Sequence, residues 1–173
     1  MSAAGIIRLS MFIRGAESMA DVKLKNLHKM VDKLKTKSAV YAGVFSDAEN
    51  EVTGEPVVPY AAKNEFGGAG VPARPFMRIT LAKRKKEWVR RLRDLVFNGG
   101  MDANAALNMM GVMMADDIQE TITSNLPPPN SPATIKRKEK KGSHSNGIMY
   151  YGTLVDTGSL YNKIDYVVRE GEK

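Results

Sequence analysis

The feature that most constrains the fold is a pair of long segments with helical periodicity, 76–97 and 103–124, separated by five residues. Apolar side chains recur at helical spacing in both segments. Asn98-Gly99-Gly100 is typical of a helix end, and Asp102 can cap the helix that follows. The apolar positions are Leu81, Trp88, Val89, Leu92, Leu95 and Val96 in the first segment, and Leu107, Met110, Met114, Ile118 and Ile122 in the second.

Three other segments have the alternating or β-rich pattern of strands. Residues 6–14 place apolar side chains at every second position, residues 39–45 read AVYAGVF, and the chain closes with an alternating segment at 160–168. Helices are expected after Ser18 and at 59–66. This order predicts one α+β domain spanning 1–173, with a small, mainly antiparallel sheet packed against two or three long helices.

A polar segment with several prolines follows the second long helix. It contains PPP, SP and KRKEKK and almost no apolar residues. Long connections of this composition bury too little apolar surface to offset their ordering entropy. We therefore predict a flexible loop at about 127–147.

The stretch NEFGGAGVPARPFMR, residues 64–78, is stiffened by two prolines and bent by three glycines. Two phenylalanines can anchor this bend in the core, and either Glu65 or a carboxylate of a neighbouring subunit can pair with one of the two arginines. Two interpretations remain open: a rigid entry into the following helix, or a loop that also contacts another subunit. The residues predicted to anchor the loop or to form a subunit interface are Glu65, Phe66, Gly67, Arg74, Pro75, Phe76 and Arg78.

Positive charge is concentrated in one part of the chain. The net charge is +7, and the segment from Arg74 to Asp94 holds nine basic residues against two acidic ones. Four of the basic residues form a stripe beside the apolar face of the predicted helix; this basic stripe comprises Lys83, Lys86, Arg90 and Arg93. It has three possible roles: a solvated helix face, a contact for nucleic acid phosphates, or a contact for an acidic protein.

The sequence offers little for catalysis. It has no cysteine, and its two histidines, His28 and His144, are far apart without metal-ligand spacing. Asp156-Thr157-Gly158 resembles the active-site turn of aspartic proteases, but one copy is present and only 15 residues follow it. We expect a local C-terminal turn at Asp156, Thr157 and Gly158, no enzyme activity, and no catalytic, cofactor-binding or metal-binding residues.

No apolar run approaches the ~18 residues that a membrane span needs. The apolar N-terminal segment MSAAGIIRLSMFIRG contains arginines, which makes it a poor signal peptide. We expect a protein made in the cytoplasm, without a membrane partner.

Four blocks, in this order, resemble the tail-completion or neck proteins of long-tailed bacteriophages, in the virion-morphogenesis and minor-tail-component families. The first two are YAAKNEFGG and VPARPFMR, which lie directly before the long charged helix. The third contains Ser131, Pro132, Thr134, Ile135 and Lys138, and the fourth contains Leu154, Asp156, Thr157, Gly158 and Leu160. Together they cover most of residues 59–168.

The resemblance implies a structural virion protein of the neck or tail, made in the host cytoplasm. Such a protein forms a ring, expected to be a hexamer, at the head-proximal end of the tail, where it joins the filled head to the tail. Its implied partners are copies of itself, other neck and tail proteins, and packaged DNA through backbone contacts. The alternative is an accessory protein that binds DNA without sequence specificity.

Overall fold

The computed structural model describes residues 25, 37–51, 53–140 and 152–170. The chain divides into two units, 1–35 and 36–173. The first unit is described only at Lys25, so the strand predicted at 6–14 and the helix predicted after Ser18 lie outside the described residues. The single domain of 173 residues stays a prediction. Everything below concerns the second unit.

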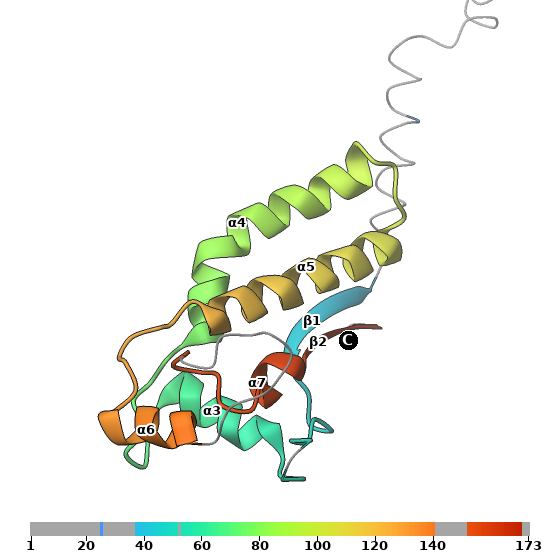
Figure 1. Ribbon diagram of the computed structural model, residues 1–173. Helices are drawn as coiled ribbons and strands as arrows, with labels where there is room; N and C mark the ends of the chain where they lie inside the picture. The colour runs from blue at the N-terminus through green and yellow to red at the C-terminus, as the bar shows by residue number, and fades with distance from the viewer. Residues whose placement is uncertain (1–24, 26–36, 52, 141–151, 171–173) are drawn as a thin grey trace, which may run out of the picture. The chain divides into compact units, whose positions relative to one another are not determined.

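The second unit has the predicted α+β fold with a small antiparallel sheet. Strand β1 (Ser38–Val44) pairs with β2 (Ile164–Glu170), and their register places Ser38 opposite Glu170 and Val44 opposite Ile164. Figure 1 shows the two strands side by side along helix α5. Leu160, which was expected in the last strand, instead lies in the short helix α7 (Ser159–Asn162) before it.

The two long helices begin and end almost where their periodicity predicted. Helix α4 spans Phe76–Phe97 and helix α5 spans Ala103–Thr123. The Asp102 carboxylate accepts the backbone N–H groups of Asn104 (2.9 Å) and Ala105 (3.2 Å), which confirms the predicted cap. Helix α5 contacts both α4 and the sheet, and thus holds the unit together (Figure 1).

Gly111 lies where α5 approaches strand β2 most closely. A Cβ atom at this position would lie 2.0 Å from Cδ2 of the Tyr166 ring. Helix and strand can therefore pack at this distance only because residue 111 has no side chain.

The face that α4 buries agrees with the predicted one only in part. Val96 is buried, Leu81 and Val89 are exposed, and the other three expected positions are half-buried: Trp88, Leu92 and Leu95. Phe76 and Thr80 are buried as well. The contact of α4 with α5 also includes polar side chains, which hydrophobic periodicity does not detect. In the hydrophobic core, α4 contributes Phe76, and the other members are Val57, Ala61, Ala115, Ile118, Ile122, Leu126, Leu154, Val155, Leu160 and Ile164.

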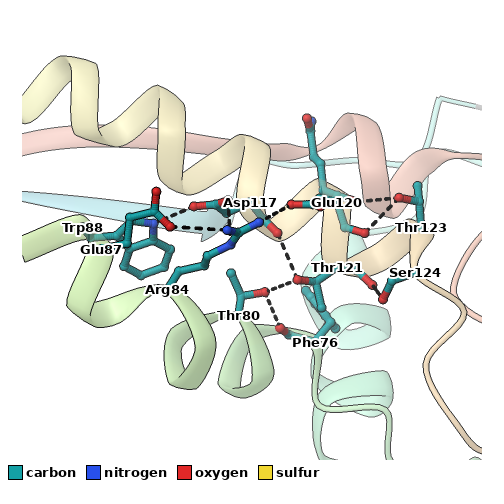
Figure 2. A network of polar contacts seen from close by, with 11 residues as sticks. Phe76, Thr80, Arg84, Glu87, Trp88, Asp117, Glu120, Thr121, Thr123 and Ser124 are labelled. Atoms are coloured by element: carbon teal, nitrogen blue, oxygen red, sulfur yellow. Dashed lines mark hydrogen bonds and ion pairs between the residues drawn. The ribbon is translucent and has the colours of Figure 1, made fainter. Parts of the chain in front are cut away.

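Polar side chains join α4 to α5 in the network drawn in Figure 2. Arg84 forms ion pairs with Asp117 (3.0 Å) and Glu120 (2.6 Å) on α5. Trp88 Nε1 donates to the same Asp117 at 2.6 Å. Deeper in the interface, the hydroxyls of Thr80 and Thr121 share a buried hydrogen bond of 2.7 Å. These contacts fix which face of α4 turns towards α5.

Two shorter helices complete the unit. Helix α3 spans Val57–Phe66, close to the predicted 59–66. Helix α6 spans Pro132–Lys140 and lies inside the segment predicted as a flexible loop at 127–147. The loop predicted there thus contains a helix over 132–140, its flexibility stays a prediction, and residues 141–147 lie outside the described residues. The helix was not predicted because the expectation depended on apolar side chains alone, whereas α6 is anchored by a buried lysine.

Candidate functional site

Glu65, in the last turn of α3, caps the first turn of α4. Its carboxylate accepts the backbone N–H groups of Met77 (2.9 Å) and Arg78 (3.1 Å). Pro75, at the N-cap position, makes no side-chain hydrogen bond to these N–H groups. A carboxylate at a helix N-terminus also interacts favourably with the helix dipole. The stretch 64–78 thus locks the end of one helix to the start of the next.

Arg78 closes this connection from the outside. Its Nε donates to Oε1 of Glu65 at 2.9 Å, and its Nη2 donates to the backbone carbonyl of Glu65 at 2.7 Å. The guanidinium carbon lies 5.2 Å from the centroid of the Phe66 ring, which is within the range of a cation–π contact. The predicted pairing of Glu65 with one of the two arginines is therefore confirmed for Arg78.

The two phenylalanines of this stretch have opposite environments. Phe76 is 1% exposed and belongs to the core, as predicted, whereas Phe66 is 69% exposed. The prediction that Phe66 anchors the bend in the core was wrong. Gly67, directly after it, has a φ of 78°, and a Cβ there would lie 3.0 Å from the Ala73 backbone nitrogen. This turn ends α3 and leaves the Phe66 ring on the surface.

Arg74 is buried, with 4% of its surface exposed. Its Nε donates to the carbonyl oxygen of Pro128 at 2.9 Å, and its Nη2 donates to Oδ1 of Asn130 at 3.2 Å. Burial lowers the pKa of Arg74. Unlike Arg78, this arginine binds neutral oxygen atoms, and it ties the stretch 64–78 to the segment that precedes α6.

Lys138 is the buried lysine of α6, with 6% of its surface exposed. Its Nζ donates to the carbonyl oxygens of Gly152, at 2.8 Å, and of Val155. Burial lowers the pKa of Lys138 from its ordinary value of 10.5, and the negative charge of Asp156 opposes this shift. Lys138 therefore ties α6 to the segment that leads into α7.

These contacts surround a pocket of about 500 Å³, which we call the Arg74 pocket. Each of the four blocks that carry the resemblance contributes to its wall: Asn64 from the first, Arg74 from the second, Lys138 from the third and Asp156 from the fourth. Its charged lining residues among those described are Arg74, Arg137, Lys138 and Asp156, and Thr153 also lines it. Blocks that are far apart in the sequence thus meet at one place.

The predicted C-terminal turn is present at 156–158. Gly158 has a left-handed φ of 82° and is the N-cap residue of α7. The hydroxyls of Thr157 and Ser159 are 2.7 Å apart. The turn therefore starts a short helix, and β2 begins only after it, while Asp156 faces the Arg74 pocket.

The basic stripe lies on an exposed part of α4. Lys83, Lys86, Arg90 and Arg93 are all exposed, and Arg93 reaches the neighbouring Asp94 only at 3.9 Å. Within the described residues, the other three take part in no ion pair. Arg84, from the same basic run, is bound instead in the network of Figure 2. Arg84 is thus used in packing against α5, whereas the four stripe cations face outwards.

Sequence reasoning missed α6 and the role of Lys138. A signal for the helix was present, because Ser131 and Pro132 have the types preferred at the N-cap and first helical positions. Ser131 Oγ accepts the backbone N–H of Thr134 at 3.3 Å. No local signal marks Lys138 as buried, since its carbonyl partners come from a different part of the chain.

Among the described residues, no group of three or more histidine, aspartate or glutamate side chains could hold a metal ion. The part of the chain that the structure describes contains no helix both long and apolar enough to cross a membrane. Comparisons with family models, with curated proteins and with solved structures gave no match to this chain.

Proposed function

We propose that this protein is a structural component of the neck or tail of a long-tailed bacteriophage. In this role it completes the tail or joins head to tail, and it forms a ring, expected to be a hexamer, at the head-proximal end of the tail. The observation that carries the proposal is the convergence of the four resembling blocks on one framework of buried contacts. Arg74 and Lys138 donate hydrogen bonds to backbone carbonyls and an amide, and Glu65 accepts them from backbone N–H groups and from Arg78. Contacts of this kind support a role in stabilising the fold.

The basic stripe supports a position beside packaged DNA. Its four cations are exposed, and the helix that carries them is held against α5 by the network in Figure 2. A fixed row of cations suits contacts with phosphates, which position a nucleic acid without reading its sequence. In a ring, we expect the stripe to face the channel through which DNA passes.

Surface aromatic and aliphatic side chains support contacts between subunits. Phe66, Val89 and Tyr41 are all more than half exposed. Phe66 is held by Arg78 at the end of α3, so its position is defined even though its ring is on the surface. Neighbouring subunits in a ring would cover some of these side chains, which lowers the free energy of assembly.

Electron microscopy and mass measurement of the purified full chain test the proposal. We expect closed rings with one subunit number, formed without DNA or formed on isolated tail tubes. A protein that stays monomeric at every concentration, and that assembles on no tail tube, would contradict the proposed function.

The second candidate function is that of an accessory protein binding DNA without sequence specificity, and the same basic stripe favours it. Such a protein would bind duplex DNA as a monomer or small oligomer, with an affinity that falls steeply as salt rises. The two candidates differ in what assembly requires. Rings that form without DNA favour the virion protein, whereas oligomers that appear only on DNA favour the accessory protein.

A further inference from the structure

The Arg74 pocket contains two buried cations whose hydrogen-bond partners are neutral. Arg74 binds a carbonyl and an amide oxygen, and Lys138 binds two carbonyls. Within the described residues neither takes part in an ion pair. Buried charges in proteins are usually paired with an opposite charge or bound to an ion. Two such cations at one pocket should attract an anion.

The charges of the described residues that line the pocket do not cancel. Arg137 adds a third cation on the exposed side, and Asp156 is the one carboxylate among the described lining residues. Three positive charges against one negative charge leave an excess of two. A dianion would neutralise both excess positive charges, whereas a single carboxylate would neutralise only one.

The pocket also has a hydrogen-bonding group without a partner. Oγ1 of Thr153 is buried and makes no hydrogen bond in the part of the chain that the structure describes. A buried polar atom of this kind costs free energy unless something binds it. Thr153 lines the pocket together with Arg137 and Lys138. A hydroxyl is a donor that suits an oxygen atom of a ligand.

From these observations we propose that the Arg74 pocket binds a phosphate group. Arg137 and Lys138 supply charge-assisted donors, Thr153 supplies a hydroxyl donor, and Arg74 contributes its positive charge. A volume of about 500 Å³ admits a phosphate ion or the phosphate of a small ester. Bound phosphate would join the stretch 64–78, α6 and the segment before α7. The proposal goes beyond the virion role and does not depend on ring formation.

Titration calorimetry on the full chain tests the proposal with two probes, sodium phosphate and a nucleoside 5′-monophosphate, each in sodium chloride of matched ionic strength. We expect saturable binding to one site. Tighter binding of the ester would identify an esterified phosphate as the ligand, and equal or tighter binding of phosphate would identify the free ion. Absence of saturable binding by both probes would overturn the proposal.

Two matched variants on α6 locate the site. Arg137→Gln removes a cation that lines the pocket, whereas Lys136→Gln removes the neighbouring exposed cation, which does not line it. We expect Arg137→Gln to weaken phosphate binding about tenfold, because one charge-assisted contact is lost. Lys136→Gln should leave the affinity unchanged. Equal effects of the two variants would show attraction to the general surface charge and would overturn the proposal.

Thr153→Val provides a second test that does not alter charge. Valine keeps the shape of threonine and removes a hydroxyl that has no partner, so the variant should fold at least as stably as the wild type. We expect it to bind phosphate several-fold more weakly. Unchanged affinity in Thr153→Val would remove this hydroxyl from the site and contradict the proposed geometry.

Discussion

The Arg74 pocket and the basic stripe hold cations of the same kinds in opposite environments. In the pocket, Arg74 and Lys138 are buried and bound to backbone or amide oxygens. On the stripe, Lys83, Lys86 and Arg90 are exposed, and within the described residues they have no ion pair. The pocket cations connect parts of one chain, whereas the stripe cations are available to another molecule. A count of basic residues cannot separate these two roles, but burial and hydrogen bonding do.

The largest expected effect concerns the anchor beside the pocket. Phe76→Ala should lower the free energy of unfolding by about 3–5 kcal/mol, because the ring is almost fully buried. Phe66→Ala is the matched control at the other end of the same stretch. Its ring is on the surface, so the loss should be under about 0.5 kcal/mol. Denaturant unfolding of both variants checks this difference, and equal losses would contradict the two environments.

Removing the Glu65 carboxylate should have the next largest effect. Glu65→Ala leaves two backbone N–H groups at the start of α4 without their partner, and Arg78 keeps only its bond to the backbone carbonyl of residue 65. We expect a loss of about 1.5–3 kcal/mol in the free energy of unfolding. Glu49→Ala, at an exposed loop position, is the control and should be nearly neutral. Similar stabilities of the two variants would show that the Glu65 carboxylate does not stabilise the start of α4.

Gly111→Ala tests the packing of α5 on the sheet, away from both groups of cations. Overpacking costs about 1–3 kcal/mol, and the better helix propensity of alanine returns about 1 kcal/mol. Because the added Cβ would lie 2.0 Å from the Tyr166 ring, we expect the clash to prevail and stability to fall. Thermal melting measures the change, and adding Tyr166→Ala should remove most of the difference between glycine and alanine. A more stable single variant would show that the ring moves aside freely.

The smallest expected effect is a pH dependence that separates the pocket from the stripe. The pKa of Lys138 is lowered in the folded state, so between that pKa and 10.5 the unfolded chain binds more protons than the folded one. The contribution of Lys138 to stability therefore rises with pH in this window. Lys138→Met should flatten the rise, while Lys86→Met should not.

Denaturant unfolding between pH 8 and 10 gives the slopes for this comparison. The upper limit of pH 10 avoids the titration of Tyr60. Burial raises the pKa of Tyr60 from 10.0, so above that pH the folded chain binds more protons than the unfolded one and stability falls as pH rises. Identical slopes for the two variants would mean that the environment of Lys138 does not favour its neutral form.

Local patterns in the sequence were enough to predict several elements. The bounds of α4 and α5, the Asp102 cap and strand β1 all depend on residues close together in the chain. Helical and strand periodicity, together with capping preferences, contain this information. A pairing of Glu65 with Arg74 or Arg78 could also be expected, because all three lie in one stretch of fifteen residues, but the structure was needed to show that the partner is Arg78.

The rest depends on contacts between distant segments. Arg74 is buried because residues 128–130 fold over it, and Lys138 is buried because residues 152–155 supply its carbonyl partners. Nothing near either residue in the sequence indicates these partners. The network around Arg84 likewise joins two helices through side chains that no local pattern pairs, and two of the predicted apolar positions of α4, Leu81 and Val89, are exposed.

The central claim is that the stripe cations act on another molecule and do not hold the fold. It is tested most directly by reversing two stripe charges, Lys83→Glu with Arg90→Glu, in assembled particles. The control is Lys85→Glu with Arg91→Glu, which makes the same charge change at exposed positions of α4 outside the stripe. Tail-to-head joining and DNA retention are scored for both variants.

We expect the stripe variant to fold, to form rings and to join heads to tails. Its particles should retain less DNA than the control particles, because contacts with phosphates are lost. Loss of joining with unchanged DNA affinity would instead assign the stripe to an acidic protein partner. Stripe-variant particles that join normally and hold the normal amount of DNA would contradict the claim and leave the stripe as a solvated helix face.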